Sequence, residues 1–212
     1  MPRKTKFSKH EIIEAGLFQI RDGGWESLTP KTVSKRLNSS TMPIFSHFPN
    51  MHALREAILD HAWELLETYT SRNYTGDVWV DQSIGYIIFA RDNDRLFGCM
   101  HYGKPDDIRE RRRKFWISIS KPLENHPAFE DMTSEQIGWT RHIRSLLTHG
   151  IAISVGTGLA TVWSNDEVIK QVLCLCSDIL VEGFKNRKNQ LKALSELIPP
   201  ETLKVIRTVR KE

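Results

Sequence analysis

The 212-residue chain has few cysteines, few glycines and prolines, and no low-complexity segment. Its three cysteines are an odd number, and none lies in a C-x-x-C spacing. We interpret Cys174 and Cys176, which lie in an apolar run, as small core residues rather than as a redox or metal site. With only 12 glycines and nine prolines, the sequence is not typical of a disordered or fibrous protein.

Long apolar runs are also missing. The longest uncharged apolar stretch, residues 150–163, is too short to span a membrane. The basic start, MPRKTKFSKHE, is not followed by an apolar run, so we expect no secretory signal. These two absences predict a cytoplasmic protein with no membrane partner.

Motifs that carry catalysis or bind cofactors are absent. Gly156-Thr157-Gly158 opens no G-x-G-x-x-G sequence, and neither G-x-S-x-G nor H-E-x-x-H occurs. The eight histidines are scattered, without the spacing of metal ligands. We therefore expect no enzyme, no cofactor and no metal.

The sequence does contain an uneven distribution of positive charge. The chain carries a formal charge of +4 in total. Residues 1–36 hold eight basic and four acidic side chains, so the whole excess lies in the first sixth of the chain. Either this region attracts a polyanion such as nucleic acid, or it is a solvated basic tail.

Helix signals in the first fifty residues predict three helices with a tight turn between the second and the third. Ser8 and Glu11 form a capping box, and Gly23-Gly24 ends the first helix. Thr29 caps a second helix that begins at Pro30. Asn38-Ser39 makes the turn, and Ser40 is the expected cap of the third helix, with Pro43 in its first turn. This is the order of a helix-turn-helix unit.

The third helix would bury Ile44 and Phe48 and leave its other side chains outside. Thr41 can donate to and accept from a base edge, and apolar side chains suit thymine methyl groups. Hydroxyls and a histidine suit phosphate oxygens. The predicted DNA-binding residues are Thr29, Lys31, Thr32, Ser40, Thr41, Met42, Pro43, Phe45 and His47. The alternative is a three-helix bundle whose exposed aromatic residue contacts another protein.

The segment LTPKTVSKRLNSSTMPIFSHFPNMHALREAIL, residues 28–59, resembles the DNA-binding region of the TetR/AcrR family of transcriptional regulators. The family pattern runs roughly L-T-x-x-x-[IV]-A-x-x-L-G-V-S-x-x-x-[LI]-Y-x-H-F-x-x-K-x-x-L. Matching positions are Thr29, Val33, Leu37, Ser40, Ile44, His47, Phe48 and Leu54. Asn38-Ser39 replaces Gly-Val, Ser34 replaces Ala, Phe45 replaces Tyr and Met51 replaces Lys.

The resemblance implies an all-α fold: a helix-turn-helix DNA-binding domain over residues 1–50 and a larger helical effector-binding and dimerisation domain over 51–212. Thr133 with Gln136, and Ser164 with Glu167, predict the starts of two long C-terminal helices. Their apolar faces, around 139–150 and 169–184, are too wide for one neighbour. By resemblance these helices pair with their copies in a homodimer; the alternative is a monomer with two core helices.

A small-molecule effector site is expected among large apolar groups with a few polar handles. The candidate residues are Phe89, Phe97, Met100, His101, Trp116, Trp139 and His142. The sequence thus predicts a ligand-responsive repressor that binds a palindromic double-stranded operator. The competing interpretation is a helical protein-binding adaptor of the same fold that does not read DNA, because the third helix carries no Lys or Arg.

Overall fold

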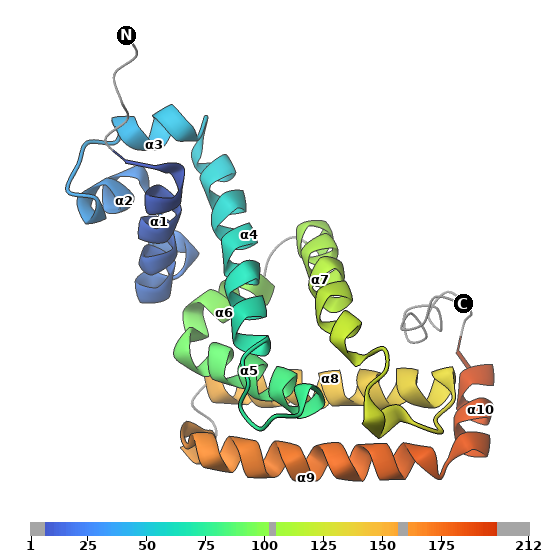
Figure 1. Cartoon of the computed structure of the whole chain (residues 1–212). Coiled ribbons are helices and arrows are strands. Elements are labelled where there is room, and N and C mark those ends of the chain that lie inside the picture. Colours follow the sequence, from blue (N-terminus) through green and yellow to red (C-terminus); the bar gives the residue numbers. More distant parts are fainter. Residues whose placement is uncertain (1–6, 102–104, 157–160, 199–212) are drawn as a thin grey trace. The chain divides into compact units, whose positions relative to one another are not determined.

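The computed structural model describes residues 7–101, 105–156 and 161–198, and in these ranges every regular element is helical (Figure 1). This confirms the all-α prediction. The helices are α1 (Lys9–Gly23), α2 (Pro30–Arg36), α3 (Met42–His47), α4 (Met51–Thr70), α5 (Val78–Asp92), α6 (Asp94–His101), α7 (Pro105–Ser120), α8 (Ser134–Gly156), α9 (Asp166–Lys185) and α10 (Lys188–Glu196). Four 3₁₀ turns join them: η1 (Trp25–Ser27), η2 (Lys121–Leu123), η3 (Pro127–Phe129) and η4 (Thr161–Ser164). None of the helices in the described ranges is long and apolar enough to cross a bilayer.

The chain forms two compact units. The first comprises residues 1–67 and 92–115, and the second comprises 68–91 and 116–212. The functional boundary predicted near residue 50 corresponds to the turn before α4, inside the first unit, and stays a prediction.

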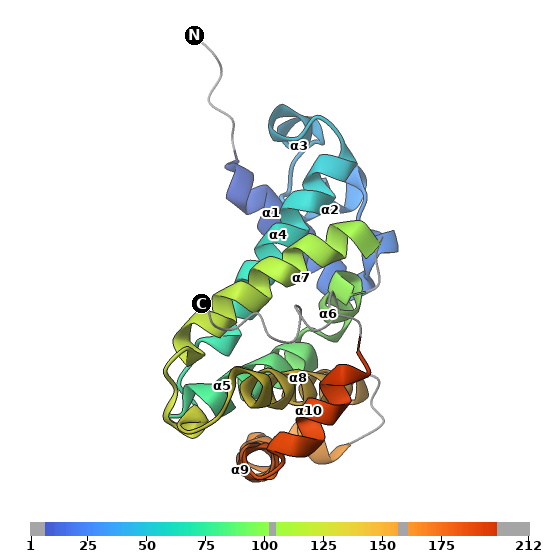
Figure 2. The ribbon, with the colours of Figure 1, turned by 90° about the vertical axis from the view of Figure 1, so that its right-hand side faces the viewer.

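In the first unit, α1 packs beside α4 and is followed by α2 and α3 (Figures 1 and 2). The predicted capping box starts α1: Glu11 N donates to Ser8 Oγ (3.2 Å), and Ser8 N donates to the Glu11 carboxylate (2.7 Å). That bonding lowers the pKa of Glu11. The helix ends at Gly24, whose φ of 68° favours glycine. A side chain at Gly16 would overlap Ile58, so the glycine permits the close approach of α1 to α4.

A basic run at 109–114 is mostly a solvated face of α7. Arg109, Arg112 and Lys114 are exposed, and exposed Arg113 pairs with Glu110 at 2.9 Å. Arg111 is the exception, since its guanidinium reaches Glu56 (2.9 Å) and Asp60 (2.7 Å) of α4. This residue therefore links α7 to α4 within the first unit.

In the second unit, α8 and α9 lie side by side and antiparallel, and α10 packs against the end where α9 finishes (Figures 1 and 2). Thr133 and Gln136 cap α8 reciprocally, as predicted. The start predicted for α9 at Ser164 is wrong: Asn165 is the cap, and its side chain accepts from Glu167 N at 2.8 Å. Ser164 instead is the last residue of the preceding turn η4, so its backbone belongs to that turn and not to the start of α9.

Candidate nucleic-acid interface

Helix α2 is fixed at its start by two threonines and one proline. Thr32 N donates to Thr29 Oγ1 (3.1 Å), and Thr29 N donates to Thr32 Oγ1 (3.0 Å), while Pro30 occupies the first turn. Val33, on the inward face of α2, is fully buried. The second helix of the predicted unit therefore has a fixed start and a buried face.

The turn between α2 and α3 relies on Asn38. Its φ is 46°, a left-handed conformation that asparagine tolerates better than most residues, as predicted. Ser39 N then donates to Ser34 O at 3.0 Å, which closes the turn. Asn38-Ser39 thus takes the place of the Gly-Val of the family pattern, and the turn still forms.

The start of α3 differs from the prediction by one residue. Thr41, not Ser40, is the N-cap, and its hydroxyl makes no capping bond. Pro43, at the second helical position, has no N–H, and Ile44 N is already bonded to Thr41 O at 3.1 Å. The amides of the second and third helical positions, which an N-cap side chain usually bonds, therefore need no bond from Thr41.

The outward face of α3 is largely apolar. Met42 is 75% exposed and Phe45 is 47% exposed, whereas Ile44 and Phe48 are buried as predicted. Thr41, Pro43 and His47 are half-buried, and Ser40 is exposed. The structure thus groups Ser40 to His47 on one short helix and the turn before it.

Three predicted phosphate contacts already have bonds inside the chain. The Thr32 hydroxyl donates to Ser27 O at 2.7 Å, and Thr29 Oγ1 lies 3.0 Å from Thr32 Oγ1. His47 Nε2 lies 2.9 Å from the carbonyl oxygen of Phe7, so this nitrogen donates there. These groups hold the unit together as well as facing outward, which sequence reasoning did not foresee.

Basic side chains surround the unit unevenly. Lys31 and Lys35 are exposed on α2, while Arg36 pairs with Asp22 and also donates to Gln19 (2.8 Å). The Lys9 ammonium lies 5.5 Å from the ring centre of Phe48. Three further basic residues near the N-terminus lie outside the described residues: Arg3, Lys4 and Lys6.

Several solved structures share this helical order. A transcriptional regulator from Rhodococcus sp. RHA1 is 16% identical with a TM-score of 0.63, over 84% of this chain and 97% of that one. The chain shares the all-helical fold of this regulator. A protein of unknown function from the same organism is 15% identical with a TM-score of 0.58, over 86% and 98%. A TetR variant from Acinetobacter baumannii AYE, solved with minocycline, is 18% identical with a TM-score of 0.48, over 87% and 99%. No family model and no curated protein matches the sequence.

The residues predicted to form the effector site fall in both units. Phe97, Met100 and His101 belong to the first unit, where the Phe97 and His101 ring centres are 4.4 Å apart. The others, Phe89, Trp116, Trp139 and His142, belong to the second unit. There Trp139 and His142 are in edge contact, with ring centres 6.0 Å apart, and partial burial lowers the pKa of His142.

Two buried arginines of α8 were missed by sequence reasoning. Arg144 donates to Trp79 O and to Gln82 Oε1 (3.2 Å), and its guanidinium lies 3.6 Å from the Trp79 ring centre. Arg141 donates to Ser120 Oγ through Nη2, but its Nε and Nη1 are buried without a partner in the part of the chain that the structure describes. Burial lowers the pKa of Arg141 to about 10. Burial, with the nearby Arg141 charge, lowers the pKa of Arg144 to about 9.

Both arginines are therefore charged at pH 7, and Arg141 is only 2% exposed. A buried charge without a counter-charge is costly, and native proteins usually compensate it. The only sequence signal was the i, i+3 spacing of two arginines within an apolar helix, which is also the spacing of a solvated face.

Proposed function

We propose that the protein is a homodimeric transcriptional repressor that releases a palindromic DNA operator when a small molecule binds its second unit. The observation that supports this best is α3, a six-residue helix after a tight turn with large side chains exposed. A helix in that arrangement fits the major groove. The all-helical fold shared with the Rhodococcus regulator is consistent with the proposal.

Base reading is assigned to the outward residues of α3. The Thr41 hydroxyl has no capping role, so it can bond a base edge. Met42 and Phe45 present apolar surface that suits thymine methyl groups. Exposed Lys31 and the basic residues before α1 supply contacts to phosphates, which position the protein without reading sequence.

Dimerisation is assigned to α8 and α9. Leu146, Leu147, Leu175 and Ile179 are 53%, 36%, 60% and 58% exposed in one chain. A methyl group added at Gly150 of α8 would meet nothing within 4 Å, so close approach of another helix is possible there. Pairing these faces with their copies would bury them in a four-helix interface and hold two reading helices at a fixed spacing.

The effector is proposed to carry an acidic group. Two buried guanidinium nitrogens of Arg141, Nε and Nη1, have no acceptor among the described residues, and a carboxylate or phosphate would supply both charge and acceptors. The guanidinium carbon lies 6.0 Å from the ring centre of half-buried Trp116, one of the predicted pocket residues. Because the free N–H groups are buried, entry of the ligand must displace a neighbouring side chain, and this displacement is a means of coupling binding to conformation.

The test of DNA reading begins without knowledge of the operator. Full-length protein selects duplexes from a random library, and fluorescence anisotropy then compares the enriched duplex with a scrambled one. We expect a palindromic enriched sequence, tighter binding to it than to the scrambled duplex, and affinity that falls steeply with salt. Failure to enrich any sequence at low salt would refute the proposal.

The protein-binding adaptor remains a second candidate because α3 carries no Lys or Arg and exposes Met42 and Phe45. An adaptor would bind both duplexes equally and weakly. The affinity of an adaptor for its protein partner would depend little on salt, because burial of apolar surface involves no release of counterions. The anisotropy measurements therefore separate the two candidates.

A further inference from the structure

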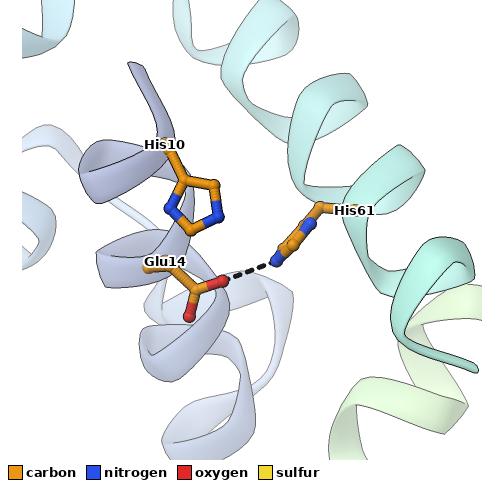
Figure 3. A group of neighbouring side chains, drawn as sticks. All are labelled: His10, Glu14 and His61. Atoms are coloured by element: carbon orange, nitrogen blue, oxygen red, sulfur yellow. Dashed lines mark hydrogen bonds and ion pairs between the residues drawn. The ribbon is translucent and has the colours of Figure 1, made fainter. Parts of the chain in front are cut away.

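Three side chains that commonly ligate metals meet between α1 and α4. His10 and Glu14 are four residues apart on α1 and so share one face, and His61 of α4 points toward them (Figure 3). One ligand atom from each residue lies within 4.8 Å of the other two. His10 is exposed, and Glu14 and His61 are half-buried, so solvent ions can reach the group.

The hydrogen bonds of His61 require a cation at one of its nitrogens. Nε2 lies 2.5 Å from Glu14 Oε1, and Nδ1 lies 3.2 Å from Glu64 Oε2. A neutral imidazole has only one N–H and cannot donate to both carboxylates. If Nδ1–H donates to Glu64, then Nε2 presents a lone pair to the Glu14 carboxylate, and this contact needs either a proton on Nε2 or a metal ion bound by both atoms. A metal ion would require the two atoms to separate to about 3.3 Å.

We propose that His10, Glu14 and His61 bind a divalent late first-row transition metal ion, with Zn²⁺ as the test ion. Two imidazole nitrogens and one carboxylate oxygen suit Zn²⁺, whereas Ca²⁺ and Mg²⁺ prefer oxygen ligands alone. Glu64 orients His61 from behind, as carboxylates do for zinc-bound histidines. Water would complete the coordination.

The ligands must move slightly to close on an ion. With bonds of about 2.0–2.1 Å, tetrahedral ligand atoms are roughly 3.3 Å apart, which is closer than the outer limit of the present group. The rings of His10 and His61 are in edge contact, with centres 5.3 Å apart, and His10 is exposed, so its ring has space to rotate. Rotation of His10 can therefore complete the site.

Metal binding would fasten α1 to α4. The two helices touch at Gly16 and Ile58, and a bond network through His61 would add a second point of attachment. An ion that binds only the folded chain stabilises it by RT ln(1 + c/Kd), where c is the concentration of free ion, so the melting temperature should rise with c. This role is independent of whether α3 reads DNA, and so its test needs no operator.

The alternative is a plain ion pair in which protonated His61 bridges Glu14 and Glu64. In that case Zn²⁺ would not bind at micromolar concentration, and the three residues would contribute only to the stability of the metal-free chain.

The experiment uses full-length protein without an affinity tag, stripped of metal and titrated with Zn²⁺ against a chromophoric chelator. We expect one ion whose affinity falls at least tenfold in His10→Ala and in Glu14→Gln, and about tenfold in Glu64→Gln through loss of orientation. His52→Ala is the matched control, because His52 is an exposed histidine of the same helix α4 outside the group. Its affinity should equal that of the wild type.

A second measurement locates the ion if His61→Asn fails to fold. Co²⁺ bound by nitrogen and oxygen ligands absorbs visible light, and the absorption should vanish in His10→Ala, an exposed position whose replacement leaves the fold intact. Loss of the zinc-dependent rise in melting temperature should accompany it. Absence of zinc binding, or binding that His10→Ala and Glu14→Gln leave unchanged, would overturn the proposal.

Discussion

Thr41 and Arg141 illustrate how a polar group that makes no bond within the described chain becomes a candidate for binding an external partner. Thr41 caps nothing because Pro43 lacks an N–H and Ile44 N is already bonded. In Arg141 the buried nitrogens Nε and Nη1 have no acceptor among the described residues. Both observations depend on which donors remain unpaired after the chain has folded.

At Thr41 we expect replacement by alanine to weaken binding to the selected duplex by about 1–3 kcal/mol and to leave binding to a scrambled duplex nearly unchanged. Thr41→Ser retains the hydroxyl and should restore most of the affinity. Anisotropy titrations at one fixed salt concentration measure all three proteins. Equal losses on both duplexes would show that Thr41 positions the protein and does not read sequence.

At Arg141 we expect Arg141→Met to leave the unfolding free energy unchanged or to raise it by about 1–4 kcal/mol, because it removes a buried unpaired charge. Arg144→Met should instead destabilise by about 1–3 kcal/mol, since Trp79 O and Gln82 Oε1 lose their donor. Urea denaturation at pH 7 measures both. A large destabilisation in Arg141→Met would mean that its charge is already compensated in the free protein.

Among the elements, the starts of the helices show how far their N-caps can be predicted from the sequence. The reciprocal pairs Ser8–Glu11 and Thr133–Gln136 were predicted correctly, because each satisfies two amides locally. The caps of α3 and α9 were each predicted one residue too early. There the choice depends on backbone bonds of the preceding turn, which the residue types alone do not specify.

Sites built from distant elements were less accessible to sequence reasoning than the local helix-turn-helix unit. Its turn, buried Ile44 and exposed Phe45 all follow from periodicity within a dozen residues. His61 lies 47 residues from Glu14, and Arg144 lies 65 residues from Trp79. Such pairs depend on how helices pack, and no spacing in the sequence indicates it.

The packing of α5 on the end of α4 offers a test at this scale. A side chain at Gly85 would overlap the carbonyl oxygen of Tyr69, which is backbone and cannot rotate away. We expect Gly85→Ala to destabilise the second unit by several kcal/mol, although alanine favours helices by about 1 kcal/mol over glycine. Thermal unfolding that ranks Gly85→Ala at or above the wild type would contradict the observed packing.

For the molecule as a whole, function as a repressor requires that assembly, DNA binding and effector binding be coupled. A single short α3 contacts few bases, so useful specificity requires two copies at a fixed spacing. Operator DNA and effector must then weaken each other's binding by the same factor. A compound that binds both conformations equally would change nothing, however tightly it binds.

The dimer can be tested on the exposed face of α8 and α9. Ile179→Asp places a charge where 58% of the isoleucine is exposed in one chain, so the isolated chain should fold nearly as well as before. If that face meets its copy, the charge would be buried without a partner and the variant should sediment as a monomer. Lys192→Glu on α10 also changes charge at an exposed position and should remain dimeric.

Loss of assembly should remove operator binding together with the dimer, because one reading helix alone keeps only the weak contacts of a half-site. Anisotropy on the selected duplex should therefore show Ile179→Asp binding no better than the wild type binds a scrambled duplex. A monomeric wild type at micromolar concentration would refute the interface, and so would a dimeric Ile179→Asp variant with normal melting temperature. A monomeric variant with full operator affinity would instead show that each chain reads DNA independently, which would remove fixed spacing as the means by which an effector releases the operator.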